Sequence, residues 1–132
     1  MLHPDQFQVN QAWILFQLND APIHIKADGD FNCLALMDAA SCYILTSSFY
    51  PLSQGEFSEL ESRRILKQAS EHKGALPKIL YIPVEQKADS LARAAERQKI
   101  EVIRVPEEQL LIFIGEARQG FRERFGGAGK HS

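Results

Sequence analysis

Short apolar runs separated by turn-forming residues dominate the first fifty residues of the chain. Residues 12–18 (AWILFQL) are too few for a stable helix and are rich in aromatic and branched side chains, which predicts a strand. Residues 23–27 (IHIKA) alternate apolar with polar, and the Asp-Gly-Asp stretch at 28–30 is a hairpin signal. With returning strands at 31–39 and 43–50, the pattern predicts a three-stranded antiparallel meander preceded by an extra N-terminal strand.

A helix is predicted over residues 54–72, where apolar side chains recur every three or four positions. Ser53 is expected to be its N-cap, because Glu56 follows three residues later and completes a capping-box pattern. Gly74, next to Lys73, is a stop signal at the other end.

Strands and helices alternate in the second half of the chain. Residues 78–82 (KILYI) form a continuous apolar run, as expected for a strand buried on both faces. A helix is predicted over 86–98, a strand over 100–105, and a last helix over 106–125. Strand-helix-strand passages of this kind place the strands parallel, through right-handed crossovers.

The predicted fold is therefore a single α/β domain over residues 1–125, with a mixed sheet in which the meander is followed by α-β-α-β-α. Residues 126–132 are glycine-rich and polar, and they are expected to form a flexible C-terminal tail.

The composition adds few constraints on function. The chain has 132 residues, 45% hydrophobic and 24% charged, with a net charge of -2, so no global basic field attracts nucleic acid or membrane. Cys33 and Cys42 are expected to be reduced thiols, because two cysteines without a CxxC spacing make a poor zinc site. The N-terminus lacks a signal-peptide pattern, and no apolar run approaches the ~20 residues of a membrane span, so a cytoplasmic location is expected.

Three stretches resemble the ribonuclease H-like catalytic core of retroviral integrases and transposases. The sequence FNCLALMDAASCYILTSSFYP, over residues 31–51, looks like the second and third strands of that core, with Ala-Ser-Cys-Tyr at 40–43 as the connecting turn. The sequence LPKILYIP at 76–83 is similar to the fourth strand, and LARAAERQKIEVIRVP at 91–106 to the following helix and fifth strand. The resemblance implies a ribonuclease H-like fold over about residues 22–125.

The resemblance also implies where catalytic acids would stand, since that chemistry uses two Asp and a third acid to hold two metal ions. The position of the first Asp falls on His24, or on Lys26 if the hairpin differs in length. The position of the second falls at Pro83, and the third acid could be Glu107, Glu108 or Glu116. One acid of three cannot hold hard cations well, so the classical site is expected to be degenerate.

Acids placed elsewhere remain weak candidates for catalysis, namely Asp28, Asp38, Glu85 and Glu116, with Mg²⁺ or Mn²⁺ as cofactor only if the chain is an enzyme. Asp28 flanks a hairpin glycine, where Asp is favoured for backbone reasons, and Asp38 is expected to cap the turn at Ser41. No residue is assigned as a metal ligand.

Arginines one helical turn apart are weak candidates for nucleic-acid contacts: Arg93 with Arg97, and Arg118 with Arg122. The competing interpretation is that they lie on solvated helix faces. The apolar run LLIFI at 110–114 could bury a homodimer seam, because a helix that is hydrophobic on every side needs a partner.

Three functions stay open. The first is a non-catalytic ribonuclease H-like domain that acts as an interaction or scaffolding module with a protein partner. The second is a metal-dependent nuclease or transposase-related enzyme with relocated acids. The third is a small nucleic-acid-binding protein.

Overall fold

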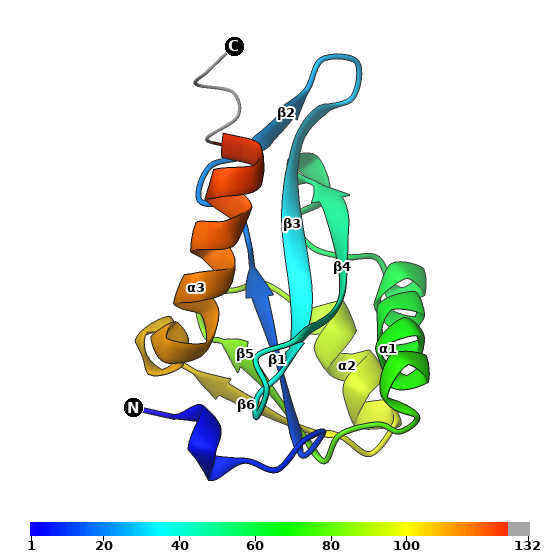
Figure 1. Cartoon of the computed structure of the whole chain (residues 1–132). Helices are drawn as coiled ribbons and strands as arrows, with labels where there is room; N and C mark the ends of the chain where they lie inside the picture. The colour runs from blue at the N-terminus through cyan, green and yellow to red at the C-terminus, as the bar shows by residue number, and fades with distance from the viewer. Residues whose placement is uncertain (127–132) are drawn as a thin grey trace.

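The computed structural model describes residues 1–126 and shows three α-helices packed on a six-stranded mixed sheet (Figure 1), as the sequence predicted. The tail expected at 126–132 lies, from residue 127 on, outside the described residues. The strands are β1 (Ala12–Gln17), β2 (Ile23–Ile25), β3 (Gly29–Asp38), β4 (Ile44–Pro51), β5 (Ile79–Pro83) and β6 (Glu101–Val105). The helices are α1 (Glu59–Lys73), α2 (Asp89–Arg97) and α3 (Leu111–Phe121).

Strand β1 lies in the middle of the sheet. It pairs antiparallel with β3 on one side and parallel with β5 on the other. Because β3 has ten residues, one of its edges holds both β1, opposite residues 34–38, and β2, opposite residues 29–31, while β4 takes the other edge. The predicted meander of β2, β3 and β4 is present, and the extra N-terminal strand that was predicted before it, β1, lies in the centre of the sheet.

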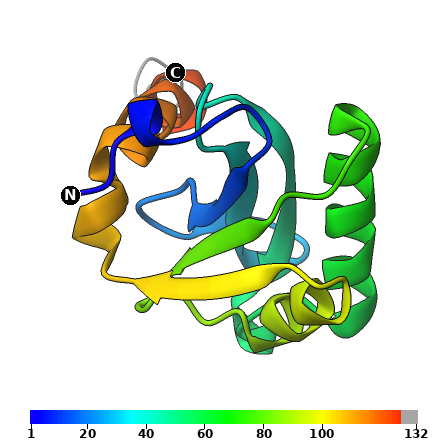
Figure 2. The same cartoon turned by 90° about the horizontal axis from the view of Figure 1, so that it is seen from below.

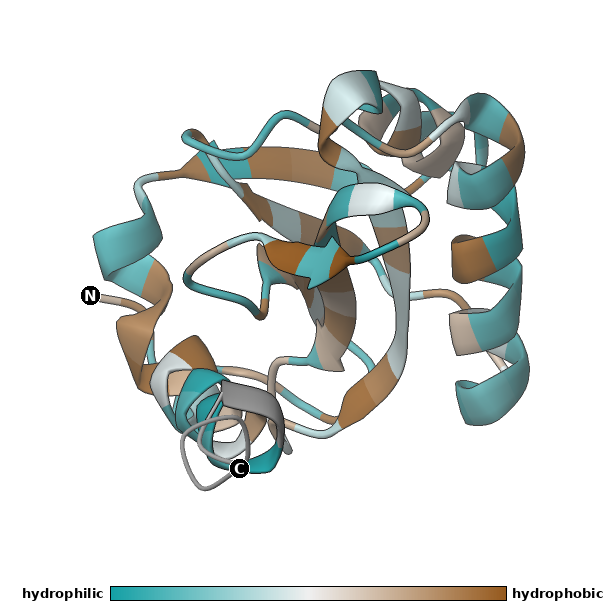
Figure 3. Cartoon of the chain, turned by 90° about the horizontal axis from the view of Figure 1, so that it is seen from above, coloured by the Kyte–Doolittle hydropathy of each residue, from teal (hydrophilic) through white to brown (hydrophobic). Residues whose placement is uncertain are grey.

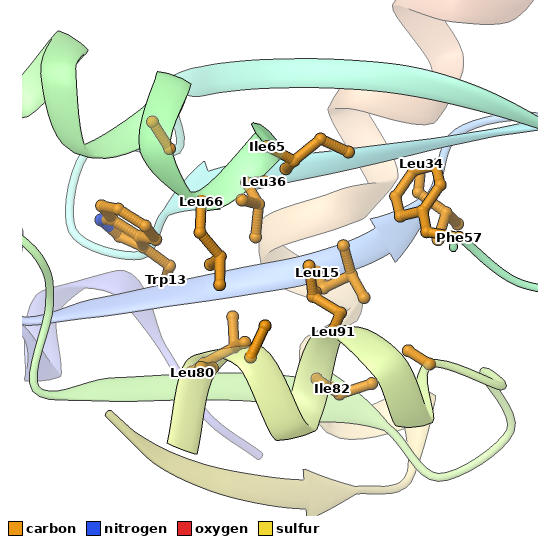
Figure 4. Packing of buried hydrophobic residues seen from close by; sticks show 14 of the residues in the cluster. Trp13, Leu15, Leu34, Leu36, Phe57, Ile65, Leu66, Leu80, Ile82 and Leu91 are labelled. Atoms are coloured by element: carbon orange, nitrogen blue, oxygen red, sulfur yellow. The ribbon is translucent and has the colours of Figure 1, made fainter. Parts of the chain in front are cut away.

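Side chains of the central strand point alternately into two core layers. Trp13 and Leu15 pack with the residues of α1 and α2, whereas Ile14 and Phe16 pack with those of α3 and the N-terminal segment. Figure 2 shows α1 and α2 on one side of the sheet and α3 with the N-terminal segment on the other. Figure 4 shows the first layer, where the helices cover Trp13 and Leu15. Burial on both faces explains why β1 is apolar throughout.

Helix α1 begins later than predicted. The Ser-x-x-Glu capping pattern occurs twice, at Ser53 and at Ser58, and the second one caps the helix. Ser58 is the N-cap, and its Oγ accepts a hydrogen bond of 3.1 Å from the backbone N–H of Glu61. Ser53 lies instead in the 3-10 turn Leu52–Gln54. Gly55 ends that turn in the left-handed conformation, with φ 82°, so a helix cannot run through it.

The two later helices are shorter than predicted. Residues 84–88 form a loop after β5, and α2 starts only at Asp89. The predicted helix 106–125 is divided into a 3-10 turn (Glu107–Leu110), α3, and a π-helical turn (Arg122–Gly126).

In the folded chain, the apolar side chains of residues 110–114 are not exposed on every side of the helix. Leu110, Phe113 and Ile114 are buried in the domain's own core. Leu111 and Ile112 are each 46% exposed. Only these two apolar side chains of the run therefore remain available to a partner. Among residues 1–126, no helix is both long and apolar enough to span a bilayer.

Both cysteines are free thiols, as predicted. Cys33 is buried in β3, and burial raises its pKa to about 11. Cys42 is half-buried and belongs to the β3–β4 turn and not to a strand, because its backbone is left-handed with φ 59°.

Candidate functional site

A polar pocket lies where three parallel strands end. Strands β1, β5 and β6 run in the same direction, so the loops that follow them meet at one edge of the sheet. Open α/β sheets usually bind ligands at such an edge. This strand-end pocket has a volume of about 300 Å³ and is lined by Gln17, Asn19, Asp20, Glu85, Gln86, Glu107 and Arg118.

Arg118 of α3 brings a fixed positive charge into the strand-end pocket. Its Nε donates a hydrogen bond of 2.8 Å to the backbone carbonyl of Gln17, at the end of β1. Its Nη2 lies 2.5 Å from Oε1 of Glu107, in the turn after β6. Only 17% of the Arg118 side chain is exposed, so the guanidinium is held within the pocket and does not extend into solvent.

Each acid of the pocket already has a donor from its own chain. Glu107 binds Arg118, and Oδ2 of Asp20 lies 2.7 Å from Nη1 of Arg122. Oε1 of Glu85 accepts a hydrogen bond of 3.0 Å from the backbone N–H of Glu107. A divalent cation would have to displace these donors and would be repelled by Arg118. Within residues 1–126, no three His, Cys, Asp or Glu side chains are grouped so that they could hold a metal ion.

Asn19 lines the pocket and is almost fully buried, with only 4% of the residue exposed. Its Oδ1 accepts a hydrogen bond of 2.8 Å from the backbone N–H of Cys33. Its Nδ2 donates to the carbonyl of Ala21 at 2.9 Å and to Oδ1 of Asn32 at 2.8 Å. The bonds to Cys33 and Asn32 join the turn after β1 to β3, and the bond to Ala21 closes the turn itself, so the Asn19 amide has a structural role.

The four candidate acids do not come together. Only Glu85 lines the strand-end pocket. Asp28 is exposed in the β2–β3 turn, and Asp38 is buried at the end of β3. Glu116 lines a different pocket of about 590 Å³ between α3 and the start of β4. Burial, followed by the charges of Glu116 and Asp38, raises the pKa of the Cys42 thiol in that second pocket.

Asp38 caps the β3–β4 turn, which was the favoured interpretation of its position. Its Oδ2 accepts hydrogen bonds from the backbone N–H of Ser41 at 3.0 Å and from the Ser41 hydroxyl at 2.6 Å. Its Oδ1 accepts a bond of 2.7 Å from the backbone N–H of Asn10. Asn10 also accepts a bond of 2.6 Å from the Trp13 indole N–H. The carboxylate thus joins the N-terminal segment to the sheet.

The residues to which the resemblance assigned the first acid, His24 or Lys26, do not lie on a strand that pairs with β5. His24 lies on β2, with its side chain exposed and its Nδ1 2.8 Å from Oδ1 of Asp30, and Lys26 follows that strand. β2 does not pair with β5, whereas β1 does. The sequence of β1, AWILFQ, contains no acid. Pro83 ends β5 as predicted.

The four candidate arginines lie on opposite sides of the sheet, and three of them are in ion pairs. Arg93 and Arg97 belong to α2, whereas Arg118 belongs to α3 and Arg122 begins the π-helical turn that follows it. Arg97 lies 3.6 Å from Glu59, and the two α3-side arginines bind the acids described above. The side chain of Arg93 donates to the Ser90 hydroxyl at 3.3 Å. The structure does not group the four into one basic surface.

Sequence reasoning missed the pocket as a unit, although it had named Glu85, Glu107 and Arg118 separately. Gln17, Asn19 and Asp20 were not singled out. The signal that could have found them is the continuous apolar sequence of β1, which marks a strand covered on both faces and hence central. The residues that follow a central parallel strand are natural candidates for a site.

The comparisons with known proteins concern the fold. No protein-family model and no curated protein matches the chain. Among solved structures, the chain is similar to a chain from the simian T-cell lymphotropic virus intasome in complex with PP2A regulatory subunit B56 gamma, with a TM-score of 0.52 and 13% identity. The match covers 96% of this chain and 44% of that one, so this chain spans less than half the length of the chain it matches. At this identity the likeness shows a shared fold alone.

Proposed function

We propose that this chain is a non-catalytic ribonuclease H-like domain that works as an interaction module. The element order supports the fold assignment: antiparallel strands β1, β3 and β4 are followed by α-β-α-β-α, with β1 central. The likeness to a chain of a viral intasome supports it independently. That intasome is in complex with another protein, which makes a protein partner the natural class to test.

The observation that carries the non-catalytic assignment is the guanidinium of Arg118 in the strand-end pocket. A metal-dependent site at this edge needs acids that are free to bind a cation, with an acid on β1 or just after it. β1 has none, Asp20 after it is bound to Arg122, and Glu107 is bound to Arg118. Two acids of the pocket are therefore already paired with arginines of the same chain. The function is accordingly expected on the outer surface of the domain.

Calorimetric titration with Mg²⁺ and Mn²⁺, together with a cleavage assay on labelled oligonucleotides, tests this proposal. We expect no saturable heat at millimolar metal and no cleavage. A metal Kd below about 1 mM that Glu107→Gln abolishes, or metal-dependent cleavage lost in the same variant, would establish the enzyme alternative in its place. Asp28→Asn is the matched control, because Asp28 is an exposed acid far from the pocket in the β2–β3 turn.

Binding to a short DNA or RNA duplex at several salt concentrations tests the third candidate function. We expect weak binding, because three of the four candidate arginines are paired with acids. Submicromolar binding with a steep salt slope, weakened by Arg93→Ala, would favour a nucleic-acid-binding protein, since a steep slope reports phosphate contacts.

A further inference from the structure

We infer that this module pairs with a second copy of itself, edge to edge, through strand β4. The inference rests on the proposed interaction role and names the surface that serves it. β4 pairs with β3 along one edge, on the side of β3 away from β1 (Figure 1). Among residues 1–126, no strand pairs with the other edge of β4. That second edge is called the β4 edge below.

The hydrogen bonds of β3 show which backbone groups of β4 point outward. In an antiparallel strand, the N–H and C=O groups of successive residues point alternately to the two edges. The carbonyl of Cys33 accepts a bond of 2.9 Å from the N–H of Leu18, just after β1, so the groups of Leu34 point toward β4 instead. Leu34 is opposite Ser48, and the backbone of Ser48 is therefore bonded to β3.

The two neighbours of Ser48 have the opposite orientation. The backbone N–H and C=O groups of Ser47 and Phe49 point away from β3, along the β4 edge. In the part of the chain that the structure describes, these groups have no hydrogen-bond partner. Another extended backbone satisfies such an alternating row of donors and acceptors. The chemistry of the edge therefore calls for a β-strand as its partner.

The β4 edge also lacks the features that usually keep an edge strand from pairing, which are short length and charged side chains. The other outer strands have them, since β2 is only three residues long and β6 carries Glu101 and Arg104. β4 has eight residues, none of them charged, and its pairing with β3 is regular from Thr46 to Pro51. Figure 3 shows the most hydrophilic residues mainly on the helices and turns, and the strands mostly in hydrophobic or neutral colours.

A second copy matches the β4 edge because this edge is complementary to itself. A two-fold axis through Ser48 places Ser47 of each copy opposite Phe49 of the other, and residues paired in this way exchange both backbone hydrogen bonds. The ring of Phe49, which is 51% exposed in the single chain, then lies beside the small side chain of the partner's Ser47. No like charges meet along the strand, and the two six-stranded sheets become one. Such self-complementarity is what a twofold dimer interface requires.

Sedimentation equilibrium of the full chain tests the dimer at concentrations up to about 200 µM, which populates a dimer of micromolar Kd. We expect a concentration-dependent dimer. Phe49→Lys and Ser47→Lys should each weaken it by about tenfold or more, because each makes two lysines diagonal neighbours across the axis. Mixing Phe49→Lys with Phe49→Glu should restore association, because the diagonal neighbours then carry opposite charges.

Ile25→Lys is the matched control for the lysine variants. Ile25 is also an apolar strand residue with a large exposed fraction, 40%, but it lies on the short strand β2. The Ile25→Lys chain should therefore dimerise like the wild type.

Hydrogen exchange of single amides, measured by NMR, shows whether the dimer is built by strand pairing. The Ser47 and Phe49 amides should be protected at high protein concentration and should lose that protection on dilution, because only the dimer bonds them. The Ser48 amide, bonded to β3 in both states, is the internal control and should be protected throughout.

A wild-type chain that stays monomeric at the highest concentration overturns the inference and leaves the β4 edge to an extended segment of another protein. A dimer in which the Ser47 and Phe49 amides still exchange freely overturns it as well. So does a dimer that Ile25→Lys weakens as much as Phe49→Lys. None of these results touches the non-catalytic assignment, which depends on the metal titration alone.

Discussion

Arg118 and Glu107 form an ion pair of 2.5 Å that joins α3 to the turn after β6. The same guanidinium also binds the carbonyl of Gln17 at the end of β1. One side chain therefore holds together three elements that are far apart in the sequence, at the edge of the sheet where a ligand would otherwise be bound. The charge of Arg118 in the pocket therefore stabilises the fold.

Replacing Arg118 by Met should destabilise the domain by about 1–3 kcal/mol, because it leaves the partly buried Glu107 and the Gln17 carbonyl without their donor. Chemical denaturation of the variant measures the change. Arg122→Met is the matched control, because its ion pair with Asp20 is about half exposed and such pairs contribute about 0–1 kcal/mol. Equal effects of the two substitutions would contradict a special role for Arg118.

Asp38→Asn should cost about 2–3 kcal/mol of stability, because the amide replaces one acceptor oxygen with a donor that faces N–H and O–H groups. Thermal and denaturant unfolding measure it. Asp28→Asn in the exposed hairpin turn is expected to change stability by less than about 0.5 kcal/mol. An Asp38→Asn variant with unchanged stability would contradict the capping role of this carboxylate.

The sequence predicted where the strands and helices lie along the chain better than it predicted which strands pair with one another. Apolar periodicity is a local property, and it located β1, β3 and β5 to within a few residues. Pairing is a tertiary property. Nothing in the sequence of residues 23–27 shows that β2 has only three paired residues, or that β3 is long enough to pair with β1 as well.

The candidate site shows the same limit. Arg118 was considered as a phosphate contact because it lies one turn from Arg122, and helix spacing cannot reveal that it points toward the sheet. The twin Ser-x-x-Glu spacings at Ser53 and Ser58 were equally good N-cap signals, and the intervening Gly55 decided between them. The local rules were sound, but they did not identify the partner across the fold.

Glu56 illustrates this point, and it yields a third prediction. It was expected to complete a capping box within its own helix, yet Oε1 accepts a hydrogen bond of 2.8 Å from the backbone N–H of Ser90, in the first turn of α2. Helix α2 has no cap from its own N-cap residue, Ala88, so a side chain from a distant loop replaces it.

Glu56→Ala should therefore destabilise the chain by about 1 kcal/mol and speed hydrogen exchange at the start of α2. Exchange rates of the Ser90 amide, measured by NMR, report the loss directly. Glu59→Ala is the control, because Glu59 is in an exposed ion pair with Arg97 at 3.6 Å and does not bind the Ser90 amide. Unchanged exchange in α2 after Glu56→Ala would show that the cap is not formed in solution.

The dependence of stability on acidic pH should involve Glu61. Hydrogen bonds from Arg64, then from the Ser48 hydroxyl, lower the pKa of the Glu61 carboxyl below its ordinary value of 4.5, against the opposing effect of burial. A carboxyl whose pKa is lower in the folded state stabilises the fold at pH values above its unfolded pKa. That contribution is lost as the pH falls through the lower, folded pKa.

Glu61→Gln should accordingly reduce stability at pH 7, and its difference from the wild-type chain should shrink as the pH falls below about 4.5. Urea denaturation at a series of pH values between 7 and 3 measures both trends. Glu71→Gln is the control, because Glu71 is an exposed acid on the same helix, and its curve should run parallel to the wild-type curve throughout. A Glu61→Gln difference that stays constant down to pH 3 would mean that the carboxylate is not stabilised by Arg64 and Ser48 in the folded chain.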